Sequence, residues 1–217
     1  MDEASPSAVG PSAQVPRAAA AAGVVFGLLF GTALVLLRLA IPGSIADRGG
    51  WLDDPGGTVR LAMNLLAWGG IAFLWFIGAV RTHIGAREDR FLASVYFGSG
   101  LLFLGMSFTA GAATQALLAA HAQHGAGFFD SGTFAFGGRL TYELTYTYAL
   151  RMAGVFMFSL ATLCLRTGAM PRPIVWITWA LAALLVLGLT QTLWAALVFP
   201  LWVLGLSLYL LWTPRGV

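Results

Sequence analysis

The chain of 217 residues contains no lysine, so all 12 of its basic residues are arginine. A retinal or pyridoxal Schiff base forms on a lysine amine, and the sequence therefore excludes both. The single cysteine, Cys164, excludes an internal disulfide and any cluster held by several cysteines. We expect the protein to need no cofactor.

Charge is also scarce, because only 10% of the residues are charged whereas 59% are hydrophobic. Soluble domains are about a quarter charged and about half apolar. The composition therefore predicts a membrane protein whose first partner is the lipid bilayer. The net charge of +3 is too small and too dispersed to predict binding to nucleic acid.

Six apolar runs follow one another, each near or above the roughly 20 residues that cross a hydrocarbon core about 30 Å thick. Only "TQT", residues 190–192, divides the last two runs. An unbroken helix there would be about twice as long as the core is thick, so we predict a tight turn. The sequence predicts an all-α fold, a polytopic integral membrane helix bundle of six transmembrane helices. The predicted spans are 18–41, 59–80, 91–120, 141–165, 174–189 and 193–212.

The N-terminal segment, residues 1–17, is rich in proline, serine and alanine and has little to bury, which predicts a disordered cytoplasmic tail. Residues 18–217 then form one six-span transmembrane domain. A signal peptide ending at "SIA", residues 44–46, is the alternative. The apolar run is longer than the roughly 7 to 15 residues of such a peptide, and acidic residues precede it.

The arginines predict the orientation, because basic residues in short loops are retained on the cytoplasmic side. In a six-span chain the loops on one face hold most of the arginines, and the opposite loops hold most of the acidic residues. Both termini are therefore predicted to be cytoplasmic. The first group is Arg17, Arg81, Arg87, Arg90, Arg166, Arg172 and Arg215; the opposite loops hold Arg48 and Arg139 with Asp47, Asp53, Asp54 and Asp130.

The first span carries Gly23, Gly27 and Gly31 at intervals of four residues. This spacing forms a smooth strip on one helix face, on which another helix backbone packs closely. The partner is either another helix of the chain, or a second copy or a membrane partner protein docking on this face.

The outer segment of residues 121–138 combines histidines, phenylalanines and glycines. His121 and His124 are spaced so that both face one side of a helix, and Asp130 could complete a metal site. An isolated histidine pair is a common accident, so we expect no metal there. The phenylalanines either lie on the membrane surface or fold over the mouth of the bundle as a cover.

The stretch "RLTYELTYTYALRMAG", residues 139–154, holds the deepest charge of the chain. Counting back from Arg166 at the cytoplasmic boundary places Arg151 several residues inside the hydrocarbon. A charge at the bilayer centre costs about 2.5 to 3.5 kcal/mol, and less near an interface. Glu143 and Thr147 precede Arg151 at successive intervals of four, and Tyr148 borders this polar strip.

Glu143 and Arg151 are separated by about 12 Å along an α-helix, and helical side chains lean toward the N-terminus. We therefore expect each to find its partner on another helix. Arg38, near the outer end of the first span, could meet Glu143. Asp53 or Asp54 could meet Arg151.

Two interpretations of the polar strip remain open. In the first, the residues line an outward-facing polar pocket that binds or transports a small molecule, with Tyr142, Tyr146 and Tyr148 as its aromatic walls. In the second, they form an internal salt-bridge network that fixes helix register. We expect a protein that is not an enzyme, with a structural or assembly subunit of a membrane complex as the alternative to a transporter. The candidate ligand-binding residues are Arg151, Glu143, Tyr148, Thr147 and Arg38.

The arginine-bearing fourth span followed by "LRTGAMPRPIVWITWALAALLVLG" resembles small multi-span membrane proteins of unknown function from GC-rich bacteria. This resemblance implies a location in the bacterial inner membrane. It carries over no functional residue.

Overall fold

The computed structural model describes residues 15–41, 52, 57–84, 90–128, 132–168, 170–188 and 193–212. All regular elements in these ranges are helices, which confirms the predicted all-α class. The tail of residues 1–14 lies outside the described residues. The α-helices are α1 (Val15–Ala40), α2 (Thr58–Ile84), α3 (Arg90–His124), α4 (Gly132–Tyr142), α5 (Leu150–Thr167), α6 (Arg172–Leu187) and α7 (Val198–Trp212). Two 3₁₀ segments, η3 (Gly125–Phe128) and η5 (Leu193–Leu197), and one π-helix, η4 (Glu143–Ala149), complete the set.

Five of the described helices are long and apolar enough to cross a membrane, so the chain is a multi-pass membrane protein. The remaining predicted span corresponds to α6, which is also apolar but has only 16 residues, a length of about 24 Å. The last apolar stretch is divided as expected, because α6 ends at Leu187 and η5 begins at Leu193. The five long segments are Ala18–Ala40, Thr58–Arg81, Arg90–His124, Gly132–Thr167 and Trp194–Trp212.

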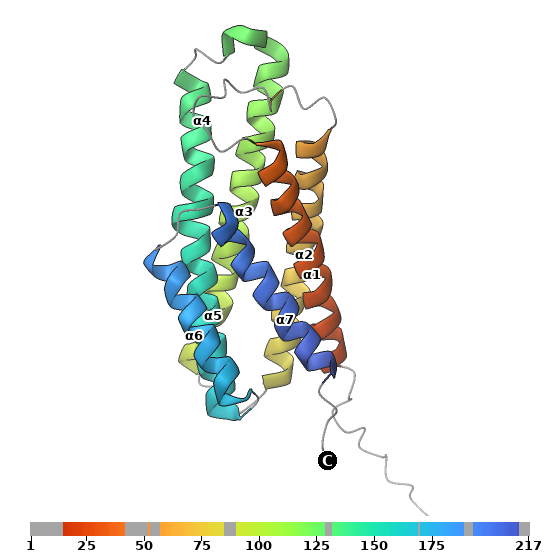
Figure 1. The fold of residues 1–217 in the computed structure, drawn as a ribbon, viewed down its shortest axis with the longest axis vertical. Coiled ribbons are helices and arrows are strands. Elements are labelled where there is room, and N and C mark those ends of the chain that lie inside the picture. Colours follow the sequence, from red (N-terminus) through yellow and green to blue (C-terminus); the bar gives the residue numbers. More distant parts are fainter. Residues whose placement is uncertain are drawn as a thin grey trace, which may run out of the picture.

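The helices form an elongated antiparallel bundle in which α1 packs on α2 and α7, and α5 packs on α3 and α6 (Figure 1). The N-terminal end of α1 and the C-terminal end of α7 lie at the same lower end of the bundle (Figure 1). At the other end α3 and α4 extend furthest. The upper ends of α6 and α7 stop below those of α1 to α4 (Figure 1). The turn predicted at residues 190–192 lies outside the described residues.

A cluster of phenylalanine rings fills the centre of the bundle. Phe199 of α7 is fully buried, and its ring centre lies 4.7 Å from that of Phe103 and 5.4 Å from that of Phe73. Phe26 and Phe156 contact the same ring at 5.8 and 5.6 Å. Lipid tails are as apolar as these side chains, so close ring packing rather than exclusion from water holds the five helices together here.

The glycine strip of α1 faces α7 of the same chain. A Cβ atom on Gly23 would lie 2.0 Å from the hydroxyl oxygen of Ser207, and one on Gly27 would lie 2.7 Å from the Cβ of Leu204. Gly31 has no such neighbour within 4 Å. Because α7 covers two of the three positions, an oligomer through this face would have to form around Gly31.

The segment between the third and fourth predicted spans contains helical structure rather than forming one long loop. Phe128 at the end of η3 is buried against α2 and α3, whereas Phe136 of α4 is 69% exposed. A Cβ on Gly137 would lie 2.6 Å from a methyl carbon of Leu117, so α4 packs directly on α3. Asp130 of the considered metal site lies outside the described residues, which contain no cluster of three or more possible metal ligands.

Candidate functional site

The polar strip lies on a π-helix. Residues Gly132–Thr167 form one continuous rod, and its middle part, η4, is wound with hydrogen bonds one residue longer than in an α-helix. The backbone N–H of Leu150 accordingly donates to the carbonyl of Thr145. π-helical turns inserted in α-helices are rare and occur frequently at functional sites. The strip was predicted as plain α-helix, so its backbone geometry is a correction to that prediction.

The carboxylate of Glu143 is paired with residues of its own continuous helix, Gly132–Thr167. One carboxylate oxygen is 2.6 Å from Nη2 of Arg139, and the other accepts a hydrogen bond from the Thr147 hydroxyl. Arg38 was considered as the partner of Glu143, but Arg139, one turn before it, takes that place. The carboxylate is therefore already compensated, and Arg151 interacts with it only electrostatically, at longer range.

Arg151 reaches the end of a neighbouring helix. Its Nη1 donates to the backbone carbonyl of Thr147, and the guanidinium lies against Gly188, where an added Cβ would be 3.2 Å from Nη2. Gly188 caps the C-terminus of α6 in the left-handed conformation, with φ of 63°. The last carbonyls of a helix lack intrahelical donors and form the negative end of its dipole, which stabilises a nearby cation. Among the described residues no carboxylate is within ion-pair distance of Arg151, and Asp53 and Asp54 lie outside them.

Gly154 sets the distance between α5 and α6. It follows Arg151 by three residues, so both lie on the same side of α5. A Cβ on Gly154 would lie 2.7 Å from a methyl carbon of Val186 and 2.8 Å from the carbonyl oxygen of Ala182. The missing side chain lets the two backbones approach, and this approach brings Gly188 to Arg151.

A second arginine, Arg38 of α1, lies beside η5. The guanidinium carbon of Arg38 is 6.0 Å from the ring centre of Trp194, within range of a cation–π interaction. Its Nε is buried and has no hydrogen-bond partner among the described residues. Tyr146 of η4 is within electrostatic range of Arg38. A small apolar cluster joins α1, η4, α5 and η5, composed of Leu34, Tyr146, Leu150, Ala195 and Ala196.

We call this group the arginine site; it consists of Arg38, Tyr146, Thr147, Arg151, Gly188 and Trp194. With Arg166 at the predicted cytoplasmic boundary, Arg151 would lie about 22 Å along α5 from it and about 8 Å inside the other face of a core about 30 Å thick. The C-terminus of α6, against which it packs, is at the same depth. Helix ends at such depth are found only where they are buried in protein or line a water-filled cavity.

The structure gathers some of the predicted ligand-binding residues and separates another. Glu143, Thr147 and Arg151 form a connected chain of contacts, and Arg38 lies beside η5. Tyr148 is 53% exposed and makes no hydrogen bond, ion pair or ring contact with these residues in the described part of the chain.

Two residues of the site, Gly188 and Trp194, were not predicted to belong to it. A glycine just after the last apolar residue of a helix is a usual C-cap signal, so Gly188 was recognisable as a helix end. Nothing in the sequence connects that helix end with Arg151.

Comparisons with protein-family models, with curated proteins and with solved structures found no match. The case for a function therefore depends on the arrangement of the site itself.

Proposed function

We propose that the protein is a six-span carrier or receptor of the bacterial inner membrane, with both termini cytoplasmic, that binds a small anionic molecule at the arginine site from the outer side. The six-span count takes α6 as a crossing, with its 16 residues shorter than the other five. The arginines near the lower ends of the helices support this orientation.

The observation that carries the proposal is the charge of the site. Arg151 lies at the C-terminus of α6 and Arg38 lies beside Trp194 of η5, while the acidic residue of the strip, Glu143, is already paired with Arg139. The N-terminus of the η5–α7 helix, which begins beside Trp194, adds the positive end of a helix dipole. The C-terminus of α6 compensates only part of the positive charge. A carboxylate or phosphate group is the complement that such a site would accept.

The position of the site supports binding from outside. Helices that end inside the membrane are a recurrent feature of transporter binding sites, where their ends contact the substrate. The ends of α6 and α7 occupy this position here, below the upper ends of α1 to α4 (Figure 1). Tyr146 and Trp194 would form the walls beside a bound anion.

The proposal is tested by ligand-dependent thermal stabilisation of the purified protein. Inorganic phosphate, succinate and lactate are the anionic probes, with glycerol as the uncharged control. We expect at least one anion to raise the melting temperature of the wild type, and Arg151→Gln and Arg38→Gln to abolish the increase. Arg90→Gln is the matched control, since Arg90 is exposed at the far end of α3.

The result also separates binding from a purely structural role. If Arg151 serves only to cap α6, Arg151→Gln will lower the melting temperature without ligand, and no anion will stabilise the wild type. That outcome contradicts the proposal and favours the interpretation in which the polar strip fixes helix register.

A further inference from the structure

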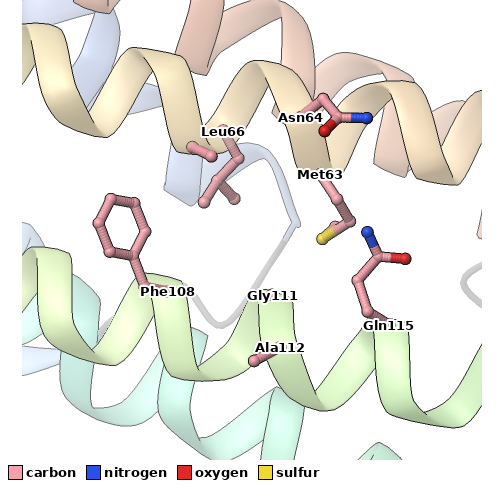
Figure 2. Close-up of a pocket in the computed structure, with 8 residues that line it drawn as sticks. Met63, Asn64, Leu66, Phe108, Gly111, Ala112 and Gln115 are labelled. Atoms are coloured by element: carbon pink, nitrogen blue, oxygen red, sulfur yellow. The ribbon is translucent and has the colours of Figure 1, made fainter.

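A groove between α2 and α3 lies apart from the arginine site. It has a volume of about 230 Å³ and is open at the surface of the bundle. Its inner end is formed by Phe108, whose ring lies so close to Gly70 that a Cβ there would be 2.4 Å away. Figure 2 shows Leu66 and Phe108 at one end of the groove, and Asn64, Met63 and Gln115 at the other. The remaining lining residues are Ala67, Gly111 and Ala112.

The groove changes from apolar to polar along its length. Asn64 donates its Nδ2 to the carbonyl of Arg60, which leaves its oxygen available. Gln115 makes no hydrogen bond among the described residues. Both side chains are exposed, and the lining contains no charged residue. Its polar end therefore suits a group that is uncharged but able to form hydrogen bonds.

This gradient is aligned with the bilayer. Arg60 and Arg81 are separated by about 31 Å along α2, which matches the thickness of the hydrocarbon core, and they mark its two boundaries. Asn64 lies about 6 Å inside the boundary at Arg60. The polar end of the groove is thus near the interface, where the ester groups of lipids lie, and the end at Phe108 points toward the bilayer centre.

The size of the groove restricts what can occupy it. From Phe108 to Gln115 the groove is about 10 Å long. A helix segment of that length is about 10 Å across and needs roughly three times the volume of the groove. A lipid chain is much thinner. A Cβ on Gly111 would lie 3.4 Å from the sulfur of Met63, an ordinary contact distance, so the glycine leaves room for a further carbon atom at this point of the groove.

We propose that the groove holds one acyl chain of a glycerolipid, with an ester carbonyl of that lipid accepting a hydrogen bond from Gln115. The lipid enters from the leaflet at the Arg60 end of α2. Because the lining is uncharged, the ester region and the chain, rather than the headgroup charge, determine binding.

The test is native mass spectrometry of the full chain in detergent micelles, titrated with dioleoylphosphatidylcholine. We expect the wild type to retain one lipid per chain. Ala112→Leu fills the groove and should weaken retention at least about tenfold. Gln115→Leu keeps the volume but removes the donor and should weaken it about two- to tenfold. Ala116→Leu, the same kind of change at the next exposed position outside the groove, is the control and should retain the lipid as the wild type does.

Equal lipid retention by the wild type and Ala112→Leu overturns the proposal. A lower dimer fraction in Ala112→Leu with lipid retention unchanged also overturns it, and assigns the groove to a second copy of the chain. Should Ala112→Leu not fold, Gln115→Leu decides, because it changes only an exposed side chain; unchanged retention in that variant overturns the proposal.

Discussion

Replacing Gly154 by alanine tests the contact that positions Arg151. The new methyl group would lie 2.8 Å from the carbonyl oxygen of Ala182 and 2.7 Å from a side-chain carbon of Val186. The carbonyl belongs to the backbone of α6 and cannot rotate away, so α6 must move outward. Such overpacking costs about 1 to 3 kcal/mol, whereas the change from glycine to alanine within a helix gains about 1 kcal/mol.

We therefore expect Gly154→Ala to lower the free energy of unfolding by up to about 2 kcal/mol. For a chain of this size this lowers the melting temperature by up to about 8 °C. The control is Gly98→Ala in α3, because a Cβ there meets nothing within 4 Å. That variant keeps only the helix-propensity gain, and its melting temperature should stay the same or rise by about 2 to 4 °C.

Both variants are measured by thermal unfolding in the same detergent, with tryptophan fluorescence as the signal. The two substitutions are chemically identical, so their difference reports the contact alone. Equal melting temperatures for Gly154→Ala and Gly98→Ala would falsify the close approach of α5 and α6, and with it the placement of Gly188 against Arg151.

Two further predictions concern the core. Phe199→Ala removes the ring that four other phenylalanines contact and should lower the free energy of unfolding by about 3 to 5 kcal/mol. Phe136→Ala, at an exposed ring, should change it by no more than about 0.5 kcal/mol. Denaturation of both variants in one detergent checks this, and equal losses of stability would refute it. Thr178→Val removes the acceptor 2.9 Å from Nε1 of Trp202 and should cost about 1 to 3 kcal/mol. Thr162→Val, whose hydroxyl bonds only to the carbonyl one turn earlier, should be nearly neutral in the same measurement, and a similar cost for both would contradict the role of the Trp202 bond.

The sequence predicted the membrane-crossing segments well, because apolar run length is a direct consequence of bilayer thickness. The division of the last run near residues 190–192 was predictable for the same reason. The helix α4 was not predicted, since its glycines and phenylalanines are typical of a loop. Packing of Gly137 on Leu117 holds this segment in helical form, and such tertiary contacts leave no local signal.

Because α4 was taken for a loop, the prediction of the candidate site was also partly wrong. Arg139 was assigned to a loop, so its place one turn before Glu143 was missed, and Arg38 was considered instead. Arg151 was predicted as a deep charge, but the end of α6 as its neighbour depends on Gly154, whose role is visible only when two helices are packed together. The π-helix has no recognised sequence pattern and could not have been predicted.

The central claim, an outward-facing and electropositive arginine site, is tested most directly by the reactivity of a cysteine at position 147. Thr147→Cys is made in a Cys164→Ala background and exposed in intact cells to membrane-impermeant methanethiosulfonates, one anionic and one cationic. Phe136→Cys, at an exposed position of α4, provides the reference ratio of the two rates. We predict that Thr147→Cys reacts from outside and favours the anionic reagent several-fold more than Phe136→Cys does. No reaction from outside, or a preference for the cationic reagent, would contradict the account.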